Sequence, residues 1–369
     1  MKKRTQSLFH KLHLYLGLFA ALTLSIVGLT GAILSYEKEI LRLLNPSSFE
    51  VKIQEKKLPM QTLVSEFFKQ KPEAQIRMIS IAKDPQESYV FRIASKKSRK
   101  GEAIYLNPYT GEILPQVRGT GFFHFIENLH RRLAMGEVGK QIVGASVLML
   151  IVIVLSGIII SLPRIKRGFF ASFSFNPKAK GRALLYSMHA ALGMWVIPFY
   201  LVVSLTGLYW SYKWYNSALY ALAGVEKPQR AMHKKPQTQE PHSPEDVAQN
   251  AHKALELFES KYGECYSSAV WFVDAKKYKW IFIDSKPAHL YARNEIIFDA
   301  KNGTILEHSP YDAKTIGGKL MASILALHTG EYFGWIGQLG MFLAALCMPL
   351  FGITGLLLYL KKRKKKREG

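Results

Sequence analysis

Cysteine and acidic residues are both scarce in this sequence. Cys265 and Cys347 are the two cysteines among 369 residues. Cys265 falls in a polar segment and Cys347 in an apolar run, so the thiols are not expected to meet, which argues against a disulfide framework or a cysteine-based metal site. Acidic residues number 27 against 50 lysines and arginines, which gives a formal net charge of +23. A charge of this size needs a topological or a binding explanation.

Charged side chains are missing from four long apolar runs. Each run exceeds the roughly 20 apolar residues that a membrane-spanning helix needs. We therefore predict an α-helical membrane protein built on a four-helix transmembrane bundle, rather than the soluble domains that length alone would suggest. The runs cover residues 12–36, 141–163, 183–212 and 332–360.

Basic residues cluster at the ends of these runs and predict how the chain crosses the membrane. They precede the first run, make up all of residues 361–367, and occur six times, with no acidic residue, in the connection 164–182. By the positive-inside rule, both termini and this connection are cytoplasmic, and the two large loops lie outside. Attraction to anionic membrane lipid then explains the net charge, and nucleic-acid binding is not expected.

The apolar runs contain an internal repeat, which indicates that the chain arose by duplication. A histidine is followed four residues later by glycine and sixteen to eighteen residues later by Leu-Thr-Gly, at His13, Gly17 and 29–31 and again at His189, Gly193 and 205–207. The remaining two runs also align. His130 precedes Gly157 by twenty-seven residues, and His328 precedes Gly355 by the same number.

The large loops repeat as well. Each is predicted to contain a helix followed by three β-strands and a turn. The first loop is predicted to contain the helix 58–70, strands 75–81, 89–93 and 103–106, the turn 107–111 and a resumed strand at 112–114. The second loop begins with a Pro- and Gln-rich entrance at 227–242. A helix from the N-cap Ser243 to Tyr262 and strands 266–272, 279–284 and 295–298 are predicted to follow.

The predicted architecture is thus a bundle of two parallel repeats, each with an extracytoplasmic α+β insertion. Its segments are transmembrane helix 1 (1–36), outer domain 1 (37–140), transmembrane helix 2 (141–163), a cytoplasmic loop (164–182), transmembrane helix 3 (183–212), outer domain 2 (213–331), transmembrane helix 4 (332–360) and a basic tail (361–369).

Four of the eleven histidines recur in both halves, and these are the candidate functional residues. We name His13 and His189 the inner pair, and His130 and His328 the outer pair. Parallel repeats place the members of a pair at one depth, facing each other if they lie near the symmetry axis. An ionisable residue at a membrane span is costly and marks a proton path, a ligand site or a cofactor, although a single interfacial histidine more often just reaches water.

Two neutral imidazoles facing across a bundle form the axial-ligand set of a b-type haem. Zinc, copper or a proton relay would need further ligands or acids nearby, and the apolar runs contain no acid. About twenty-seven residues of helix separate the two depths, roughly 40 Å, so the pairs cannot share one ligand set. Two haems, one near each membrane face, are expected.

Three segments resemble the PepSY-associated transmembrane family of iron-regulated bacterial inner-membrane proteins. They are Ile-Tyr-Leu-Asn-Pro-Tyr-Thr-Gly-Glu-Ile-Leu at 104–114, its weaker partner at 297–306, and His-Lys-Leu-His-Leu-Tyr-Leu-Gly at 10–17. The resemblance extends over nearly the whole chain. It implies a bacterial inner-membrane location, periplasmic PepSY-like insertions and a haem-b ferric-siderophore reductase that passes electrons from the cytoplasmic side to an iron chelate in the periplasm.

The resemblance also suggests roles for individual residues. The family's span histidines correspond to His13, His130, His189 and His328 as haem-iron ligands, with His10 and His124 as alternative ligands because each lies close to a repeated histidine. Arg131 and Arg132 follow His130 directly and are candidates for contacts with haem propionates or an anionic chelate. Larger fused members carry a flavodoxin-like or nicotinamide-binding domain. None is found here, so the electron donor stays open between a quinol, a flavin and a separate reductase.

Two rival hypotheses stay open beside the reductase. One is a non-catalytic membrane module whose outer domains bind a peptide, an envelope enzyme or an iron chelate, and which would be colourless when purified. The other is a quinol-linked electron donor to another periplasmic enzyme, which would share the haems but not the substrate.

Overall fold

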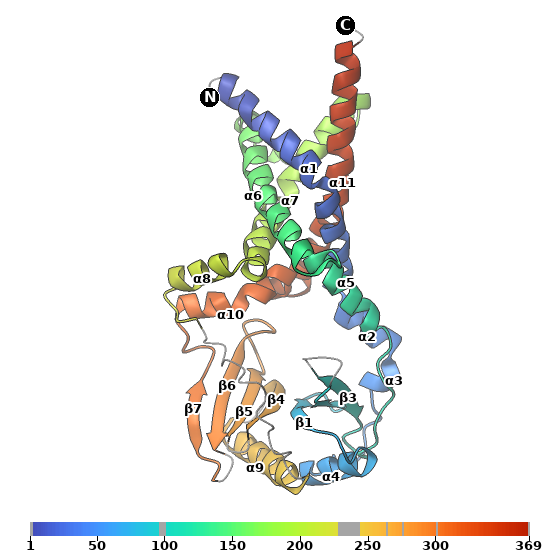
Figure 1. Cartoon of the computed structure of the whole chain (residues 1–369), viewed down its shortest axis with the longest axis vertical. Helices are drawn as coiled ribbons and strands as arrows, with labels where there is room; N and C mark the ends of the chain where they lie inside the picture. Colours follow the sequence, from blue (N-terminus) through green and yellow to red (C-terminus); the bar gives the residue numbers. More distant parts are fainter. Residues whose placement is uncertain are drawn as a thin grey trace. The chain divides into compact units, whose positions relative to one another are not determined.

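The computed structural model describes residues 3–95, 101–227, 244–262, 265–274, 277–299 and 302–367 (Figure 1). The chain forms two compact units, each built from segments distant in sequence. One unit comprises residues 1–37, 120–222 and 324–369 and contains the long apolar helices. The other comprises residues 38–119 and 223–323 and contains the β-sheet.

Four helices are long and apolar enough to cross a membrane, which confirms a multi-pass α-helical membrane protein. α1 packs against α6 and α11, and α7 packs against the same two helices, so α1 and α7 are diagonal neighbours in the bundle. Buried apolar side chains such as Leu24, Leu150 and Met348 fill its middle. The four helices are α1 (Lys3–Ser35), α6 (Gly136–Arg167), α7 (Gly181–Ser211) and α11 (Gly334–Arg367).

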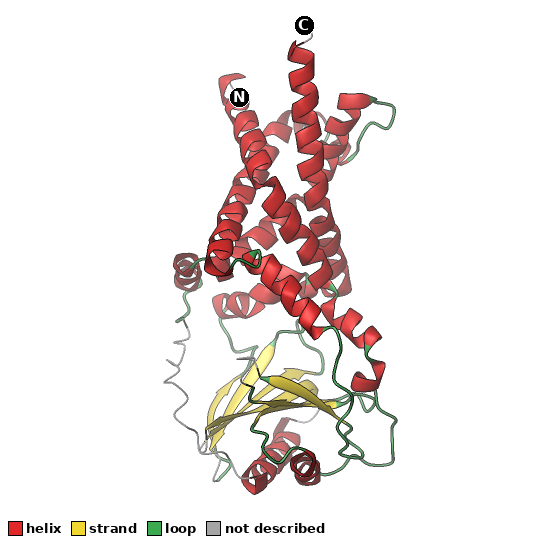
Figure 2. Cartoon of the chain, turned by 45° about the vertical axis from the view of Figure 1, so that its right-hand side comes forward, coloured by secondary structure: helices red, strands yellow, loops and turns green. Residues whose placement is uncertain are grey.

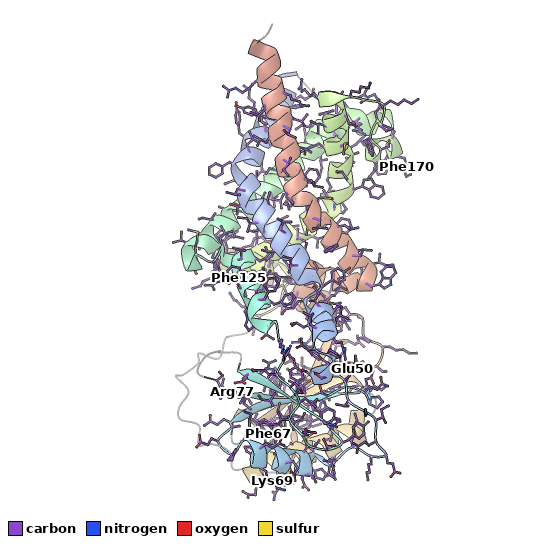
Figure 3. All side chains as sticks on the ribbon, turned by 90° about the vertical axis from the view of Figure 1, so that its right-hand side faces the viewer. Glu50, Phe67, Lys69, Arg77, Phe125 and Phe170 are labelled. Carbon is purple, nitrogen blue, oxygen red and sulfur yellow. The ribbon has the colours of Figure 1, made fainter. Side chains whose placement is uncertain are left out.

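Shorter helices accompany the spans. α5 and α10 carry His130 and His328. They fall within the predicted outer loops, at positions where no helix was predicted. α5 is amphipathic: Phe123 and Ile126 are buried, while Phe125 is exposed on the outside of the bundle (Figure 3). The short elements are α2 (Glu37–Leu44), α3 (Pro46–Phe49), α5 (Thr120–Arg132), η1 (Phe170–Phe173), α8 (Lys213–Leu222), α10 (Ile316–Thr329) and η2 (Glu331–Phe333).

A single seven-stranded antiparallel sheet joins both insertions, in the order β3-β2-β1-β4-β5-β6-β7. The first strands of the two insertions pair with each other, Ser80 opposite Ala269. An exposed β1 edge would be open to further pairing, and this contact closes it. The strands are β1 (Ile76–Ala82), β2 (Tyr89–Ile93), β3 (Glu102–Leu106), β4 (Cys265–Asp274), β5 (Lys277–Asp284), β6 (Arg293–Asp299) and β7 (Ile305–Ser309).

One hydrophobic core serves both insertions, although the sequence pattern divides them into two domains. The helices α4 (Met60–Gln70) and α9 (Pro244–Tyr262) pack side by side on one face of the sheet (Figure 2). Phe67 of α4 and Trp280 of β5 are fully buried there. The pairing of β1 with β4 unites the two halves, because a three-stranded sheet with one helix buries little apolar surface by itself.

The predicted strands agree with the structure apart from two details. The resumed strand at 112–114 is reduced to a bridge between Leu106 and Ile113, and β7 was not foreseen. The intervening turn forms as expected, with Gly111 at a φ of +74° and its N–H donating to the Asn107 carbonyl. The predicted N-cap Ser243 and the entrance 228–242 lie outside the described residues.

Candidate functional site

The four repeated histidines lie in two pairs inside the helical unit. His13 of α1 and His189 of α7 have ring centroids 6.2 Å apart and ring planes at 75°. His130 of α5 and His328 of α10 have centroids 6.4 Å apart and planes at 70°. The matching distances and angles show that both pairs have the same geometry.

Each ring of the inner pair is held by the helix that follows it in its own half. The Nδ1 atom of His13 lies 3.0 Å from the Ile153 carbonyl oxygen and 3.2 Å from Ser156 Oγ, both on α6. The Nδ1 atom of His189 lies 2.7 Å from Thr354 Oγ1 on α11. Ser156 and Thr354 occupy equivalent positions in the two halves.

The outer pair is held in the same way by α1 and α7. The Nδ1 atom of His130 lies 2.9 Å from the Val27 carbonyl oxygen and 3.1 Å from Thr30 Oγ1. The Nδ1 atom of His328 lies 2.9 Å from Thr206 Oγ1. The repeated Leu-Thr-Gly segments of α1 and α7 therefore supply acceptors for the histidines of α5 and α10.

The hydroxyl partners fix which ring nitrogen carries the proton. A carbonyl oxygen only accepts, so the Nδ1 atoms of His13 and His130 must be donors. The four hydroxyls donate their own hydrogens to helix carbonyls, from Thr30 to Ile26, Ser156 to Ile153, Thr206 to Val202 and Thr354 to Leu350. They are left to accept from Nδ1, so each neutral ring keeps an unprotonated Nε2 available as a ligand.

Glycine follows each of these hydroxyl residues and gives the ring its space. A Cβ added at Gly31 would lie 3.1 Å from His130 Cε1, one at Gly157 would lie 3.3 Å from His13 Cε1, and one at Gly207 would lie 3.4 Å from His328 Cε1. Gly355 differs, because no described atom lies within 4 Å of its added Cβ. Three of the four motifs thus combine an acceptor with room for the imidazole.

Open space lies beside the inner pair. Gly17 and Gly193 follow His13 and His189 by four residues, so each lies one turn away on the same helix face. No described atom lies within 4 Å of a Cβ added at either glycine. Other glycines serve helix packing instead: a Cβ at Gly28 would meet Met348 Cβ at 2.5 Å. Gly17 and Gly193 therefore border a space that a flat group next to the rings could fill.

Each pair is suited to bind one metal ion between its rings. A metal–nitrogen bond is about 2 Å, and the imidazole centroid lies about 1.1 Å behind the nitrogen, so two rings on opposite sides of one ion have centroids about 6.3 Å apart. The observed separations are 6.2 and 6.4 Å. Within the described ranges, no cluster of three or more His, Cys, Asp or Glu residues could hold a metal ion. In the described part of the chain, each pair thus offers two imidazoles and no further His, Cys, Asp or Glu ligand.

Burial supports neutral rings in the outer pair. Loss of solvent is the main cause that lowers the pKa of both His130 and His328. The charge of Arg131 lowers the pKa of His130 further, and the neighbouring His130 lowers that of His328. A neutral imidazole is the form that binds a metal ion.

The two pairs lie closer together than the sequence suggested. The estimate of roughly 40 Å treated residues 130–157 as one helix, but α5 ends at Arg132 and the chain turns at Leu133 and Ala134, both with positive φ. Along α1, His13 and Thr30 are seventeen residues apart, or about 26 Å. Separate sites are still required at this distance.

The remaining predicted residues lie outside both pairs. His10 is exposed and its Nδ1 lies 2.9 Å from the Gln6 carbonyl oxygen of the same helix. His124 is exposed on α5. Arg131 donates to Glu127, one turn earlier on α5, and Arg132 begins the turn into α6. Of the eight predicted site residues, the structure brings together the four repeated histidines.

Sequence reasoning missed the residues that hold and surround the rings. The Leu-Thr-Gly repeat was visible, but only the fold shows that its hydroxyls face histidines of other helices. Aromatic neighbours were also missed: the Phe351 ring lies 5.0 Å from the His189 ring, and the Trp210 ring lies 5.3 Å from the His328 ring. Neither aromatic residue has an aromatic counterpart in the first half, where Ile153 and Leu34 stand.

Comparison with known proteins gives a family but no characterised relative. A family model described as the PepSY-associated TM region matches residues 10–362. No curated protein matches the chain.

Proposed function

The chain belongs to the PepSY-associated TM region family, and on this premise we propose that it is a two-haem oxidoreductase that passes electrons across a bacterial inner membrane to a periplasmic ferric chelate, such as a ferric siderophore. One observation carries the proposal: two histidine pairs, with ring centroids 6.2 and 6.4 Å apart, each ring held through Nδ1.

The donor set fits haem b. A porphyrin supplies four nitrogens in a plane and leaves two axial positions, and each site offers two imidazole Nε2 atoms. The space beside Gly17 and Gly193 favours a flat macrocycle at the inner pair. Covalent attachment would need a Cys-x-x-Cys-His motif, which the sequence lacks. The fit therefore supports haem b at both pairs, with His13, His189, His130 and His328 as ligands.

The basic ends of the helices support one site near each membrane face. His13 and His189 lie toward the basic termini and the connection 164–182, on the expected cytoplasmic side. His130 and His328 lie on α5 and α10, just before the returning helices α6 and α11. The middle of the bundle between the pairs is filled by apolar side chains and by Tyr200, whose hydroxyl donates to the Ala344 carbonyl at 2.9 Å. This filling excludes water between the two sites.

Bound haem would supply reversible one-electron transfer. The residues of this chain hold the imidazoles, set the basicity of Nε2 through the Nδ1 hydrogen bonds, and keep water away. The substrate Fe(III) gains one electron and becomes Fe(II). The divalent ion is held less tightly by the hard oxygen ligands of a chelate, so reduction favours release of iron.

Side chains near the outer pair are suited to meet an organic chelate. Phe122 and Phe125 are each 54% exposed on α5, and Trp335 is 72% exposed at the start of α11. These rings also suit a membrane interface. Arg132 adds positive charge next to the turn, while Arg131 is engaged by Glu127. An anionic or aromatic chelate is the class of substrate that this surface favours.

The proposal is tested by separating entry of electrons from their exit. In vesicles of known orientation, His328→Ala should leave the inner haem reducible by a cytoplasmic-side donor yet abolish capture of Fe(II) from an external chelate. His13→Ala should block the entry of electrons. His124→Ala and His10→Ala are matched controls, because both histidines are exposed and lie outside the pairs.

Three results would count against the proposal in different ways. Unchanged Fe(III) reduction in a His328→Ala protein shown to lack its outer haem would remove that haem from the path. A colourless wild-type protein would favour a non-catalytic binding or regulatory module. Haems that reduce normally but pass no electrons to any ferric chelate would favour a donor to another periplasmic enzyme.

A further inference from the structure

The membrane-facing side of the bundle contains a groove between α1 and α11. It encloses about 350 Å³. Its wall is almost entirely apolar and includes Leu18, Ala21, Ser25, Pro349 and Gly352. Benzene binds in an apolar cavity of about 150 Å³, so this groove has room for a molecule with one or two fused rings.

The crossing of the two helices explains the groove. α1 and α11 touch at Gly28, where an added Cβ would lie 2.5 Å from Met348 Cβ and 2.7 Å from the Ala345 carbonyl oxygen. Pro349 follows at once, and a proline inside a helix bends it. Beyond this contact small residues keep the helices close: a Cβ at Gly352 would be 3.3 Å from Ser25 Oγ and 3.5 Å from Ala21 Cβ. These short side chains form the floor of an open groove, and larger residues such as Leu22 and Ile353 form its rim.

The other half of the duplicated chain has larger residues at the equivalent positions. Between α7 and α6, the counterparts of Ala21, Ser25 and Gly352 are Ile197, Leu201 and Val154. Val196, Tyr200 and Val154 are packed into a continuous apolar cluster there, with Ile197 and Leu201 against it. The hollow thus exists on one side of a bundle whose two sides have otherwise equivalent helices.

The groove opens to lipid and lies close to the inner pair. It is continuous with the lipid-facing surface of the bundle, because Leu22 and Ile353 on its rim are 74% and 55% exposed. Leu18 follows His13 by five residues, a rise of about 7.5 Å. Gly352 precedes Thr354, the residue that holds His189, by two. Residues two or five positions apart lie on different faces of a helix, so the groove lies at nearly the depth of the inner pair but on another side of α1 and α11. A molecule in the groove therefore comes from the membrane and lies about one helix diameter, roughly 10 Å, from the cofactor site.

We propose that this groove binds the head group of a quinol from the lipid phase, and that the quinol is the electron donor. The lining favours a flat ring that is largely apolar. Ser25 Oγ, whose own hydrogen goes to the Ala21 carbonyl at 2.6 Å, can accept a hydrogen bond from a ring hydroxyl. The donor role rests on the proposed haem function; the binding of the ring does not.

The electron balance of this donor is simple. Oxidation of one quinol to the quinone releases two electrons and two protons. The two electrons would leave one at a time by way of the cofactor that His13 and His189 would hold, and two Fe(III) ions of the external chelate would accept them. The two protons would leave to water. Two Fe(III) are thereby reduced for each quinol consumed.

The test is photolabelling of the whole protein in lipid nanodiscs with a photoreactive naphthoquinone, followed by peptide mapping. Labels should concentrate on residues 18–25 and 349–356 and should be displaced by excess unlabelled naphthoquinone. Ala21→Ile and Ser25→Leu place the residues of the other half in the groove, and each should lower labelling at least tenfold. Val152→Leu, which adds bulk at a lipid-facing position of α6, should leave the labelling unchanged.

Other outcomes would overturn the quinol site. Labels spread evenly over the lipid-facing helices, labelling that the groove-filling variants do not lower, or displacement by phospholipid alone would show that no quinone site exists. Cross-links from the groove to a second copy of the chain would make it a dimer contact. Counting haem in the same samples separates the two proposals. Labelling without bound haem would contradict the proposed reductase function, whereas bound haem without labelling would contradict the proposed quinol site.

Discussion

The two halves of the bundle agree where they hold histidines and differ in what fills the space around them. In both halves a helix hydroxyl accepts from an imidazole Nδ1, with Thr30 corresponding to Thr206 and Ser156 to Thr354. The histidine ring separations in the two pairs differ by 0.2 Å. The Nδ1 acceptor and the separation of the rings are therefore the features that both copies share.

The filling residues show what is free to vary. Tyr200 and Phe351 of the second half correspond to Leu24 and Ile153 of the first half. The groove residue Gly352 corresponds to Val154. A helix interior needs matched volume and few unpaired polar groups, which many residue combinations provide. A ligand site needs donor atoms that point in fixed directions, and few combinations of residues provide them. Differences between the halves thus indicate where the duplicated bundle acquired separate tasks.

The largest expected effect is loss of a whole cofactor by removal of one histidine. His13→Ala and His189→Ala should each halve the haem content, and the double variant should lose no more, because in the proposed arrangement both residues would ligate the same iron. His13→Ala combined with His328→Ala should lose all haem. Pyridine haemochrome counts measure this directly. If His13→Ala with His189→Ala removes both haems, ligation is not across the halves.

A smaller effect is expected where the four glycines differ in the room that they leave for a histidine ring. Gly31→Ala places a methyl 3.1 Å from His130 Cε1, whereas Gly355→Ala meets no described atom within 4 Å. The first variant should lower occupancy of the outer haem severalfold, and the second should leave both haems in place. Alanine favours a helix over glycine, so a loss in Gly31→Ala cannot be attributed to a weaker helix. Equal haem contents in the two variants would contradict the steric explanation.

Removal of one acceptor should weaken a site without abolishing it. Thr206→Val keeps the shape of the side chain but removes the acceptor for His328 Nδ1, and loss of such a partner costs roughly 10- to 100-fold in metal affinity. We expect a shifted potential and faster loss of the outer haem, with Thr206→Ser restoring both. A redox titration with the inner haem as internal reference makes the measurement. No shift in Thr206→Val would leave the hydroxyl without a role.

The smallest effect concerns a polar cluster in the second insertion that has no counterpart in the first. His289 is buried, its Nε2 lies 3.0 Å from Tyr311 Oη and 2.9 Å from Ser323 Oγ, and its Nδ1 accepts the Tyr291 N–H. Burial lowers the pKa of His289. The unfolded chain, with a histidine pKa of about 6.5, therefore binds a proton before the folded protein does.

The stability from neutral His289 is thus fully present above about pH 6.5 and falls as the pH drops from there toward the lower pKa of the folded protein. Thermal unfolding at pH 7.5 and 5.5 should show a smaller difference in His289→Gln than in the wild type. His308→Gln, at an exposed position of β7, is the control. A pH difference unchanged in His289→Gln would assign the effect to other groups.

Much of the fold was predictable because its determinants are local. Long uncharged runs specify the four spans, and alternating strands followed by the Asn107–Gly111 turn specify most of the sheet. The joining of the insertions through Ser80 and Ala269 was not predictable, because strand pairing between distant segments leaves no local pattern.

The candidate site was predictable to a different degree. The duplication identified four histidines, since a repeated residue with fixed offsets requires no knowledge of the fold. The acceptors, the ring contacts of Phe351 and Trp210, and the spacing of the two pairs depend on helix packing. The distance error arose at Leu133 and Ala134, whose positive φ values are unusual for side chains of their type. Leucine and alanine are not residue types that predict a turn.

The most direct test of the central claim is a reduced-minus-oxidised visible spectrum with a pyridine haemochrome count on purified wild-type protein, expressed with adequate haem supply. Two histidine pairs of equal geometry predict two low-spin b-type haems per chain. Protein that is folded, membrane-inserted and free of haem would contradict the claim.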